Sequence, residues 1–413
     1  MEELVERCAG LDVHRDTVVA TVRTPRSSGA GRVACTRTFA TTTAGLTALG
    51  QWLAEERVDL VGMESTGVYW KPVFFLLEEH VPRVWLLNAE HLRNVPGRKT
   101  DVADSAWIAQ LVEHGLVAPS FVPPAPIREL RDLTRHRRVL VEERTRTIQR
   151  LDKTLQDAGI KLTSVASSLL SKSGRAILEA LLAGITDPTV LAELARGRLR
   201  SKIPALREAL AGEFRVAHHG ILVAQMLAHV DFLDESITGL DARIAQTVQQ
   251  FEVVLQRLQT IPGVARKTAV SLLAEIGADM SVFPTAAHLA SWAGICPGNN
   301  ASGGRRKSGR TRHGSVWLKT ALTEAAQAAA RTKGTYLAAH HASIRGRRGS
   351  FKAIGATRHD LLIAYWHIVH DAVDYRELGA DWAMRRHSRE HQTRRLVRQL
   401  EALGLRVQLT DAA

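Results

Sequence analysis

The first 113 residues alternate between short extended apolar segments and amphipathic helical ones. The expected strands lie at 9–14, 17–22, 32–35, 58–63 and 83–87, and the expected helices at 43–56, 69–79 and 101–113. Pro25 and Gly29 mark a turn between the second and third strands. A three-stranded meander followed by alternating helices and strands predicts an α/β sheet.

The chain changes character after the proline-rich stretch 119–126, which is expected to be a stiff linker. Apolar residues recur in steps of three and four over 226–258, with one extra step of four at Val248, which is typical of a heptad repeat with a stutter. Residues 127–155 carry a weaker version, with Arg137 and Arg144 at seam positions. The two segments predict long helices that form a helical hairpin or a dimer, although ordinary core packing gives the same spacing.

Charge points to a polyanionic partner. The sequence has 55 Lys and Arg against 42 Asp and Glu, a net charge of +13, and most of this excess lies after residue 300. Concentrated basic charge most often neutralises phosphates, so nucleic acid is the expected partner. Three widely spaced cysteines indicate neither disulfides nor a zinc site. With no signal-peptide pattern and no apolar run of about 18 residues, a cytoplasmic protein is expected, with no membrane partner.

Four acidic residues are candidates for a metal site. Asp12 lies on the first expected strand, Glu64 ends the fourth, and Asp101 and Asp104 are three residues apart at the start of a helix. Carboxylates brought together repel one another unless a cation lies between them, and oxygen ligands favour Mg²⁺ or Mn²⁺. Taken singly, each has an ordinary explanation as a helix cap, a turn residue or a surface charge. Their joint order along the elements favours a two-metal nuclease site.

A second candidate is a helix-hairpin-helix, in which a tight glycine turn offers backbone N–H groups to a phosphate. The turn is Pro262-Gly263-Val264, and Arg266 and Lys267 add charge at the same end. A plain turn between two packed helices is the alternative.

A third candidate is the glycine- and serine-rich stretch 296–314. Its flexible backbone and its cations are suited to a phosphate. The residues expected to contact it are Gly303, Gly304, Arg305, Arg306, Lys307, Arg310 and Arg312. A serine there could attack a phosphodiester, but a phosphate-binding loop without covalent chemistry explains the same residues.

These motifs resemble those of the DEDD-type insertion-sequence transposases of family one-ten. Gly10-Leu-Asp-Val-His is similar to the first-aspartate motif, Met63-Glu-Ser-Thr-Gly to the glutamate motif, and Lys99-Thr-Asp-Val-Ala-Asp to the aspartate pair. The stretch from Ile261 through the serine loop is similar to the family's C-terminal transposase domain. The resemblance implies a catalytic, metal-binding tetrad of Asp12, Glu64, Asp101 and Asp104, and Ser302 as nucleophile, with Ser308 left open.

The resemblance also implies an architecture. It has an RNase H or RuvC-like catalytic domain at 1–118, a linker and coiled-coil helical region at 119–257, a helical transposase domain with a helix-hairpin-helix at 258–375, and a basic tail at 376–413. The implied partners are donor and target DNA duplexes, a structured guide RNA, and further copies of the chain in a dimer or tetramer.

The leading hypothesis is therefore a site-specific DNA recombinase that uses Mg²⁺ and a serine. A RuvC-like junction endonuclease, which hydrolyses strands without a covalent serine intermediate, is the main alternative. A non-enzymatic protein that bridges DNA is the third.

Overall fold

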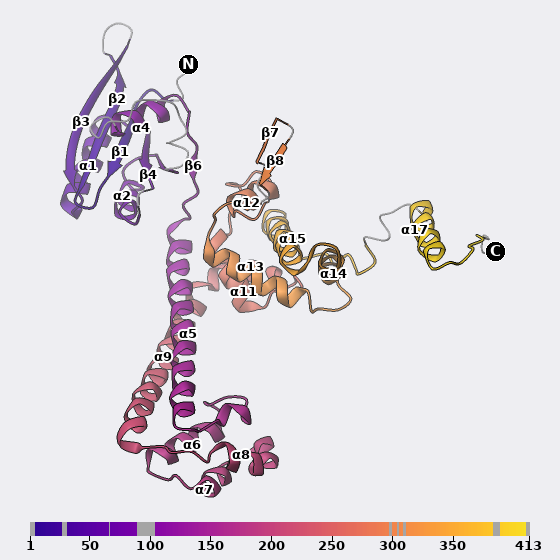
Figure 1. Ribbon diagram of the computed structural model, residues 1–413. Helices are drawn as coiled ribbons and strands as arrows, with labels where there is room; N and C mark the ends of the chain where they lie inside the picture. The colour runs from indigo at the N-terminus through magenta and orange to yellow at the C-terminus, as the bar shows by residue number, and fades with distance from the viewer. Residues whose placement is uncertain are drawn as a thin grey trace. The chain divides into compact units, whose positions relative to one another are not determined.

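The computed structural model describes residues 5–26, 31–65, 67–88, 104–296, 300–303, 305–308, 311–382 and 389–409. Its ribbon is shown in Figure 1. The chain forms two compact units, Met1–Val122 and Pro123–Ala413. Each unit is described separately below.

The first unit is a six-stranded mixed sheet in the order β3-β2-β1-β4-β5-β6. Its strands are β1 (Cys8–Val13), β2 (Thr17–Pro25), β3 (Arg32–Ala40), β4 (Leu60–Glu64), β5 (Arg83–Leu87) and β6 (Pro119–Ser120). The first three strands form the expected antiparallel meander, while β4 pairs parallel to β1 and β5 parallel to β4. The short β6 pairs antiparallel with β5, so the beginning of the predicted proline linker belongs to this sheet.

Helices cover both faces of this sheet. Alternate side chains of β1, including Leu11, share one apolar cluster with α1 (Thr43–Glu55) and α2 (Trp70–Leu77). On the other face, Cys8 and Leu60 pack with α4 (Asp104–Glu113). Both faces of β1 and β4 are therefore buried, which explains why these strands are continuously apolar rather than alternating.

In its described residues, the regular structure of the second unit is helical apart from one short hairpin. Its long helices are α5 (Ala125–Asp157), α9 (Ile221–Thr247) and α15 (Ser350–His370). The shorter α-helices are α6 (Lys172–Leu182), α7 (Pro188–Glu193), α8 (Ile203–Ala209), α10 (Glu252–Leu258), α11 (Arg266–Ile276), α12 (Ala286–Trp292), α13 (Val316–Ala329), α14 (Tyr336–Arg348) and α17 (Arg389–Ala402). The hairpin consists of β7 (Asn300–Ser302) and β8 (Arg305–Ser308).

Helices α5 and α9 lie side by side and run in opposite directions (Figure 1). Arg137 donates two hydrogen bonds to Asp241. Arg144, seven residues later in α5, does the same to Asp234, seven residues earlier in α9. The arginines that weaken the heptad pattern of α5 are thus matched by carboxylates of α9 within the same chain. Arg137 lowers the pKa of Asp241 through these hydrogen bonds.

The extra step at Val248 and two prolines, Pro188 and Pro204, coincide with helix boundaries. Helix α9 ends at Thr247, and a 3₁₀ turn, Gln249–Phe251, separates it from α10. Pro188 and Pro204 lie in the first turns of α7 and α8, where proline costs no hydrogen bond, so these residues begin helices rather than break them.

One helical stretch of the described residues, Val216–Thr247, is long and apolar enough to cross a membrane by length and composition alone. It carries Asp234 and Asp241, which are paired with α5, and Asp231, which is paired with Arg175 of α6. These pairs indicate a helix that packs against protein.

Candidate functional site

The acidic residues of the first unit share one face and one edge of the sheet. Gly10 is aligned with Gly62 in the parallel β1–β4 pair, and Leu11 with Met63. Asp12 and Glu64 each lie two residues beyond an aligned glycine, at the carboxyl ends of neighbouring strands. Side chains two residues apart on a strand point to the same face, so Asp12 and Glu64 share the face that the two glycines present.

Helix α4 covers this face and is positioned by the same glycines. A Cβ on Gly10 would lie 2.1 Å from the Ser105 carbonyl oxygen, and one on Gly62 would lie 2.5 Å from Val112 Cγ2. Glycine at both positions therefore lets the helix backbone approach the sheet more closely than any side chain would permit.

The direction of α4 places its first residue toward the acidic edge. The Ser105 hydroxyl is 2.7 Å from that of Thr21, which pairs with Gly10, and Arg23, which pairs with Cys8, donates to Glu113 at 2.8 Å. The helix thus runs antiparallel to β1, and Asp104 at its start lies toward Asp12. The positive end of the helix dipole also faces this edge, which favours negative charge there.

The structure brings three of the four predicted tetrad residues to this edge. Asp12 is mostly buried, with its Oδ2 atom 3.1 Å from His14 Nε2, and Asp104 and Glu64 are half-buried. Asp101 lies outside the described residues. Among the residues that the structure describes, no group of three or more His, Cys, Asp or Glu could by itself hold a metal ion.

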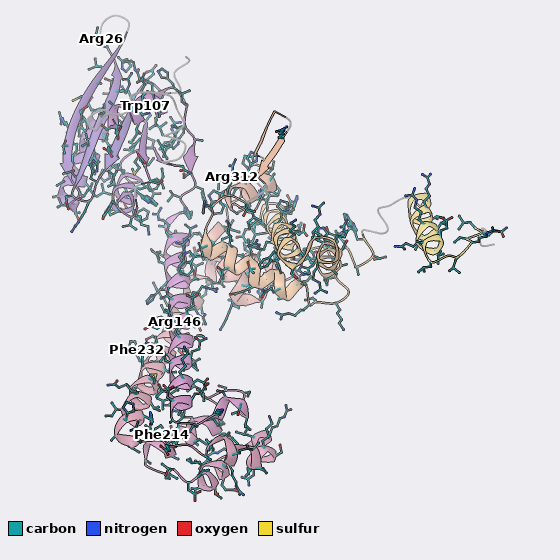
Figure 2. All side chains as sticks on the ribbon, in the orientation of Figure 1. Arg26, Trp107, Arg146, Phe214, Phe232 and Arg312 are labelled. Atoms are coloured by element: carbon teal, nitrogen blue, oxygen red, sulfur yellow. The ribbon has the colours of Figure 1, made fainter. Side chains whose placement is uncertain are left out.

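The predicted serine loop of the second unit contains a two-stranded hairpin. Ser302 is aligned with Arg305 across it, Ala301 is aligned with Arg306, and Gly303 has a φ of +57° at the turn. The sequence suggested a flexible loop because glycine and serine dominate it, but short, largely polar segments on either side of a glycine turn can also form a hairpin ladder. Arg305 and Arg312 are exposed, and Figure 2 shows Arg312 beside the hairpin. Gly304 and Arg310 lie outside the described residues, as do the side chains of Arg306 and Lys307.

The base of the hairpin is tightly closed. A Cβ on Gly294, whose φ is +65°, would lie 2.8 Å from the His313 carbonyl oxygen. A Cβ on Gly314 would lie 2.3 Å from the Ala293 carbonyl oxygen. The segments that enter and leave the hairpin are therefore in backbone contact, a relationship that only residues without side chains permit.

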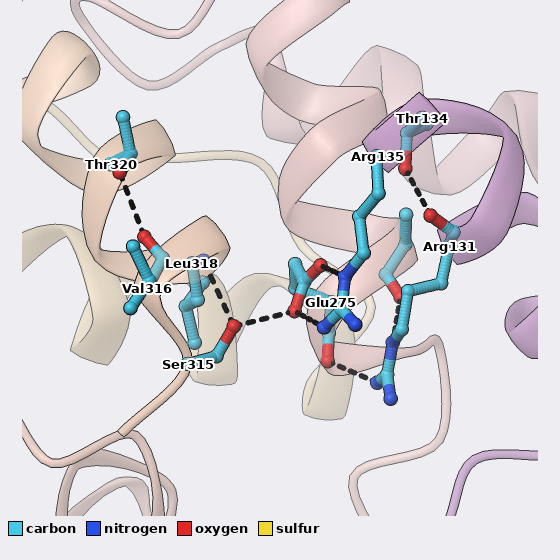
Figure 3. Close-up of polar contacts among 9 residues, drawn as sticks. Arg131, Thr134, Arg135, Glu275, Ser315, Val316, Leu318 and Thr320 are labelled. Atoms are coloured by element: carbon cyan, nitrogen blue, oxygen red, sulfur yellow. Dashed lines mark hydrogen bonds and ion pairs between the residues drawn. The ribbon is translucent and has the colours of Figure 1, made fainter. Parts of the chain in front are cut away.

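A buried ion pair contacts Ser315, the residue that follows Gly314 at the base of the hairpin (Figure 3). Glu275, near the end of α11, is 4% exposed and accepts two hydrogen bonds from Arg135 of α5, at 2.7 and 2.9 Å. The same carboxylate accepts from the hydroxyl of Ser315 at 2.9 Å, while that hydroxyl accepts from Leu318 N and caps α13. Arg131 donates to the carbonyl oxygens of Ala274 and Glu275, and its burial lowers its pKa.

Sequence reasoning did not find this network. Arg135 and Glu275 are 140 residues apart, and neither lies in a recognisable motif. The only local signal was Ser315, because serine is a common residue immediately before a helix.

The predicted helix-hairpin-helix turn lies between α10 and α11, but its glycine faces the protein. Gly263 has a φ of +87°, and a Cβ there would lie 2.4 Å from Ala329 N of α13. Val264 is buried, and Pro262 is half-buried. The turn conformation and the close approach to α13 together explain the glycine without a phosphate.

The two basic residues after this turn are exposed but differ in their surroundings. Arg266 donates to both carboxylate oxygens of Glu252, at 2.8 and 2.7 Å, which raises the pKa of the arginine and lowers that of the glutamate. Lys267 lines a groove of about 420 Å³ between α5, α9, α11 and α13, together with Arg137, Asp241 and Glu324. Mixed charge along this groove does not favour a polyanion over other ligands.

Comparison with known proteins decides the family. Residues 9–160 match the transposase family DEDD_Tnp_IS110, and residues 255–342 match the "Transposase IS116/IS110/IS902 family". The chain belongs to the IS110 family of transposases.

Relatives of this IS110-family chain include proteins of bacterial insertion elements. It is 30% identical over 227 residues to "Insertion element IS110 uncharacterized 43.6 kDa protein" of Streptomyces coelicolor, covering 50% of this chain and 55% of the relative. It is 44% identical over 72 residues to the "Pilin gene-inverting protein" of Moraxella bovis, covering 17% of this chain and 22% of the relative. The chain thus spans about half the length, or less, of these relatives.

A solved structure, that of Thermus thermophilus RuvC, matches 27% of this chain and 99% of its own, with 14% identity and a TM-score of 0.22. In the IS110-family chain, the first matched range holds Asp12, Glu64 and α4, and the second holds Glu275 and the serine hairpin. The parts at 161–254 and after 342 lie outside both ranges.

Proposed function

We propose that this IS110-family protein is a transposase that cleaves and rejoins DNA strands as a site-specific recombinase. The observation that carries the proposal is the parallel alignment of Gly10 with Gly62. This alignment places Asp12 and Glu64 on one face at one edge of the sheet. Asp104, the first residue of α4, lies toward the same edge. In this proposal the first unit is an RNase H or RuvC-like catalytic domain, because such domains hold acidic residues on a central first strand, a neighbouring strand and a later helix.

The residues at this edge suit a divalent cation. Asp12, Glu64 and Asp104 offer only hard oxygen donors, and two carboxylates at adjacent strand ends repel each other without a counter-charge. We infer that they and Asp101 hold Mg²⁺, with Mn²⁺ as a substitute. When bound, such a cation stabilises charge on a phosphate undergoing substitution. His14 Nε2 lies 3.1 Å from Asp12 Oδ2, beside the proposed site.

The proposed nucleophile is Ser302. Its hydroxyl oxygen attacks phosphorus, a phosphoserine ester forms, and the bond from phosphorus to a deoxyribose oxygen breaks, so that a DNA hydroxyl takes up a proton. A DNA hydroxyl from another strand then attacks the ester and releases the serine. The number of phosphoester bonds is conserved, so rejoining needs no external energy source. Arg305 and Arg312, exposed on and beside the hairpin, are suited to the charge of the phosphate.

The proposed partners are donor and target DNA duplexes in the cytoplasm, a structured guide RNA, and further copies of the chain. The net charge of +13 supports a nucleic-acid partner. The name of the Moraxella bovis relative supports inversion of DNA as the outcome, and that of the Streptomyces coelicolor relative supports insertion. Guide RNA and oligomer follow from the family resemblance.

The experiment that tests the serine step is covalent trapping. The full-length protein is incubated with Mg²⁺ and labelled element-end DNA, denatured, and separated to detect a protein–DNA adduct. The wild type and the Ser308→Ala variant should give the adduct, and Ser302→Ala should not. An adduct that persists in Ser302→Ala but disappears in Ser308→Ala would assign the chemistry to Ser308.

The same reactions distinguish the alternative function. A junction endonuclease that uses water would give free ends and no adduct with any variant. Asp12→Asn and Glu64→Gln should reduce strand cleavage at least about 100-fold if the carboxylates hold the cation. Cleavage at the wild-type rate in both variants would overturn the proposed tetrad.

A further inference from the structure

The corner between α14 and α15 gathers exposed cations around one exposed aromatic ring. A single residue, Gly349, joins the two helices with a φ of +83°. Phe351, in the first turn of α15, is 96% exposed and is the most exposed large apolar side chain among the described residues. Arg348 ends α14 and Lys352 follows Phe351, and both are exposed.

Charge at this corner is one-sided. The 35 residues from Ala325 to His359 include seven Lys and Arg and no Asp or Glu. In the part of the chain that the structure describes, neither Arg345, Arg348 nor Lys352 forms an ion pair with a carboxylate. This differs from α5, where Arg135, Arg137, Arg138 and Arg144 all pair with acidic groups. The arginines of α5 hold helices together, whereas those of the corner are available to a partner.

Among the described contacts, none gives the ring of Phe351 a role in packing. The neighbouring Ala353 is buried and anchors α15, so the helix begins securely without Phe351. A fully exposed phenyl ring gains nothing from burial within the chain. Arg347 donates hydrogen bonds back along α14 to Ser343. Arg348 and Lys352, three residues before and one residue after Phe351, are exposed.

We propose that the corner formed by Arg345, Arg348, Phe351 and Lys352 binds a DNA strand in which at least one base is unpaired. Phosphates are neutralised by the three cations, and the phenyl ring stacks on the exposed base. A phenyl ring makes no hydrogen bond, so the corner reads the absence of pairing rather than a sequence. This site lies outside both ranges matched to the family and rests on the proposed function, because strand exchange must expose bases.

The test measures binding of the full-length protein to three labelled probes by fluorescence anisotropy. They are a DNA duplex, the same duplex with a short central bubble, and an RNA hairpin with a loop of the same size. Phe351→Ala should weaken binding to the bubble about tenfold and leave the duplex within about twofold, since stacking applies only to unpaired bases. The Arg348→Ala/Lys352→Ala double variant should weaken both DNA probes and reduce the slope of log affinity against log salt by about 1 to 2.

Two further variants sharpen the result. Phe351→Trp should retain the bubble preference and show fluorescence quenching, relative to the wild type, when bubble DNA is added. Phe232→Ala on α9, which removes a 61% exposed phenylalanine elsewhere in the same unit (Figure 2), should bind as the wild type does.

Failure of this proposal can be distinguished from failure of the proposed serine chemistry, because Ser302→Ala, which should form no covalent adduct, should still bind the bubble as the wild type does. Equal binding of the bubble by the wild type and Phe351→Ala would overturn the proposal. So would an effect confined to the RNA hairpin, or a change of Phe351→Ala only in oligomeric state by sedimentation.

Discussion

The hydroxyl of Ser315 donates a 2.9 Å hydrogen bond to Glu275, the same carboxylate that Arg135 binds through two nitrogens. One buried acidic group thereby connects α5, α11 and the start of α13, directly after the closed base of the serine hairpin. Removing one member of a buried ion pair leaves the other charged and poorly solvated.

Arg135→Ala should therefore lower the free energy of unfolding by about 2 kcal/mol, less than for a fully buried pair because Arg135 is 30% exposed. Urea denaturation measures the change. Arg138→Ala is the matched control, since its partners Glu142 and Glu324 are more than half exposed, and it should cost less than about 1 kcal/mol. Equal losses in the two variants would contradict the special importance of Glu275.

Alanine substitutions at Gly10 and Gly62 should compare the cost of crowding a helix backbone with the cost of crowding a side chain. Gly10→Ala places a Cβ 2.1 Å from a backbone oxygen of α4, whereas Gly62→Ala meets a methyl group of Val112. We expect a loss of about 3 kcal/mol or more for Gly10→Ala and about 1 to 2 kcal/mol for Gly62→Ala. Thermal denaturation should rank them in this order, and the reverse order would show that α4 yields more easily than Val112.

Metal binding should be visible without any reaction. Mg²⁺ should raise the melting temperature of the wild type, because it relieves repulsion among the carboxylates at the sheet edge. Asp12→Asn should show a smaller rise and, without Mg²⁺, should be at least as stable as the wild type. A rise of equal size in Asp12→Asn, measured by calorimetry, would place the cation elsewhere.

The ion pair between Arg266 and Glu252 predicts a gain of binding. If the exposed Arg266 contacts DNA, Glu252→Gln should free it and increase affinity for duplex DNA about two- to fivefold. The slope of log affinity against log salt should then steepen by about 1, as one more phosphate is neutralised. Glu142→Gln, which changes an exposed glutamate paired with Arg138, is the control. Unchanged binding in Glu252→Gln would indicate that the turn serves only packing against α13.

Stability should respond to pH through His340 of α14. The hydrogen bond from its Nδ1 to Asp360, 2.6 Å long, raises the pKa of the imidazole. Its stabilising contribution is complete below the unfolded pKa of about 6.5 and is lost as the pH rises through the higher folded value. Burial lowers the pKa of the neighbouring His341, so that histidine changes stability with pH in the opposite direction. The test therefore uses a substitution at Asp360, the hydrogen-bond partner of His340. The difference in melting temperature between the wild type and Asp360→Asn should shrink as the pH rises above about 6.5, and a constant difference would exclude this pair.

The order of elements in the first unit could be predicted because apolar periodicity is local. The acidic residues were singled out for the same reason, since Asp12, Glu64 and Asp104 lie at or next to the end or start of an element. Long-range partners could not be found: Asp241 and Asp234 lie about a hundred residues from the arginines they neutralise, so the seam of α5 seemed merely weak. The sequence also does not show that α13 lies against Gly263, so it could not distinguish a phosphate-binding turn from a plain turn between packed helices.

The serine stretch shows a different limit. Its composition predicted flexibility, whereas the structure pairs Ser302 with Arg305 in a hairpin and closes the base through Gly294 and Gly314. Glycine is needed in loops and in close backbone contacts alike, and only the fold distinguishes the two uses.

The alignment of Gly10 with Gly62 has a consequence for inherited copies of such genes. Gly10 is required by the backbone of a helix, and Gly62 is favoured by a methyl group of the same helix, whatever the neighbouring carboxylates do. A copy that had lost Asp12 or Glu64 by mutation would still be destabilised by replacing either glycine, and most of all Gly10. Retained glycines in a decaying element therefore indicate an intact scaffold, whereas under the proposed function the acidic residues two positions later would indicate a working enzyme.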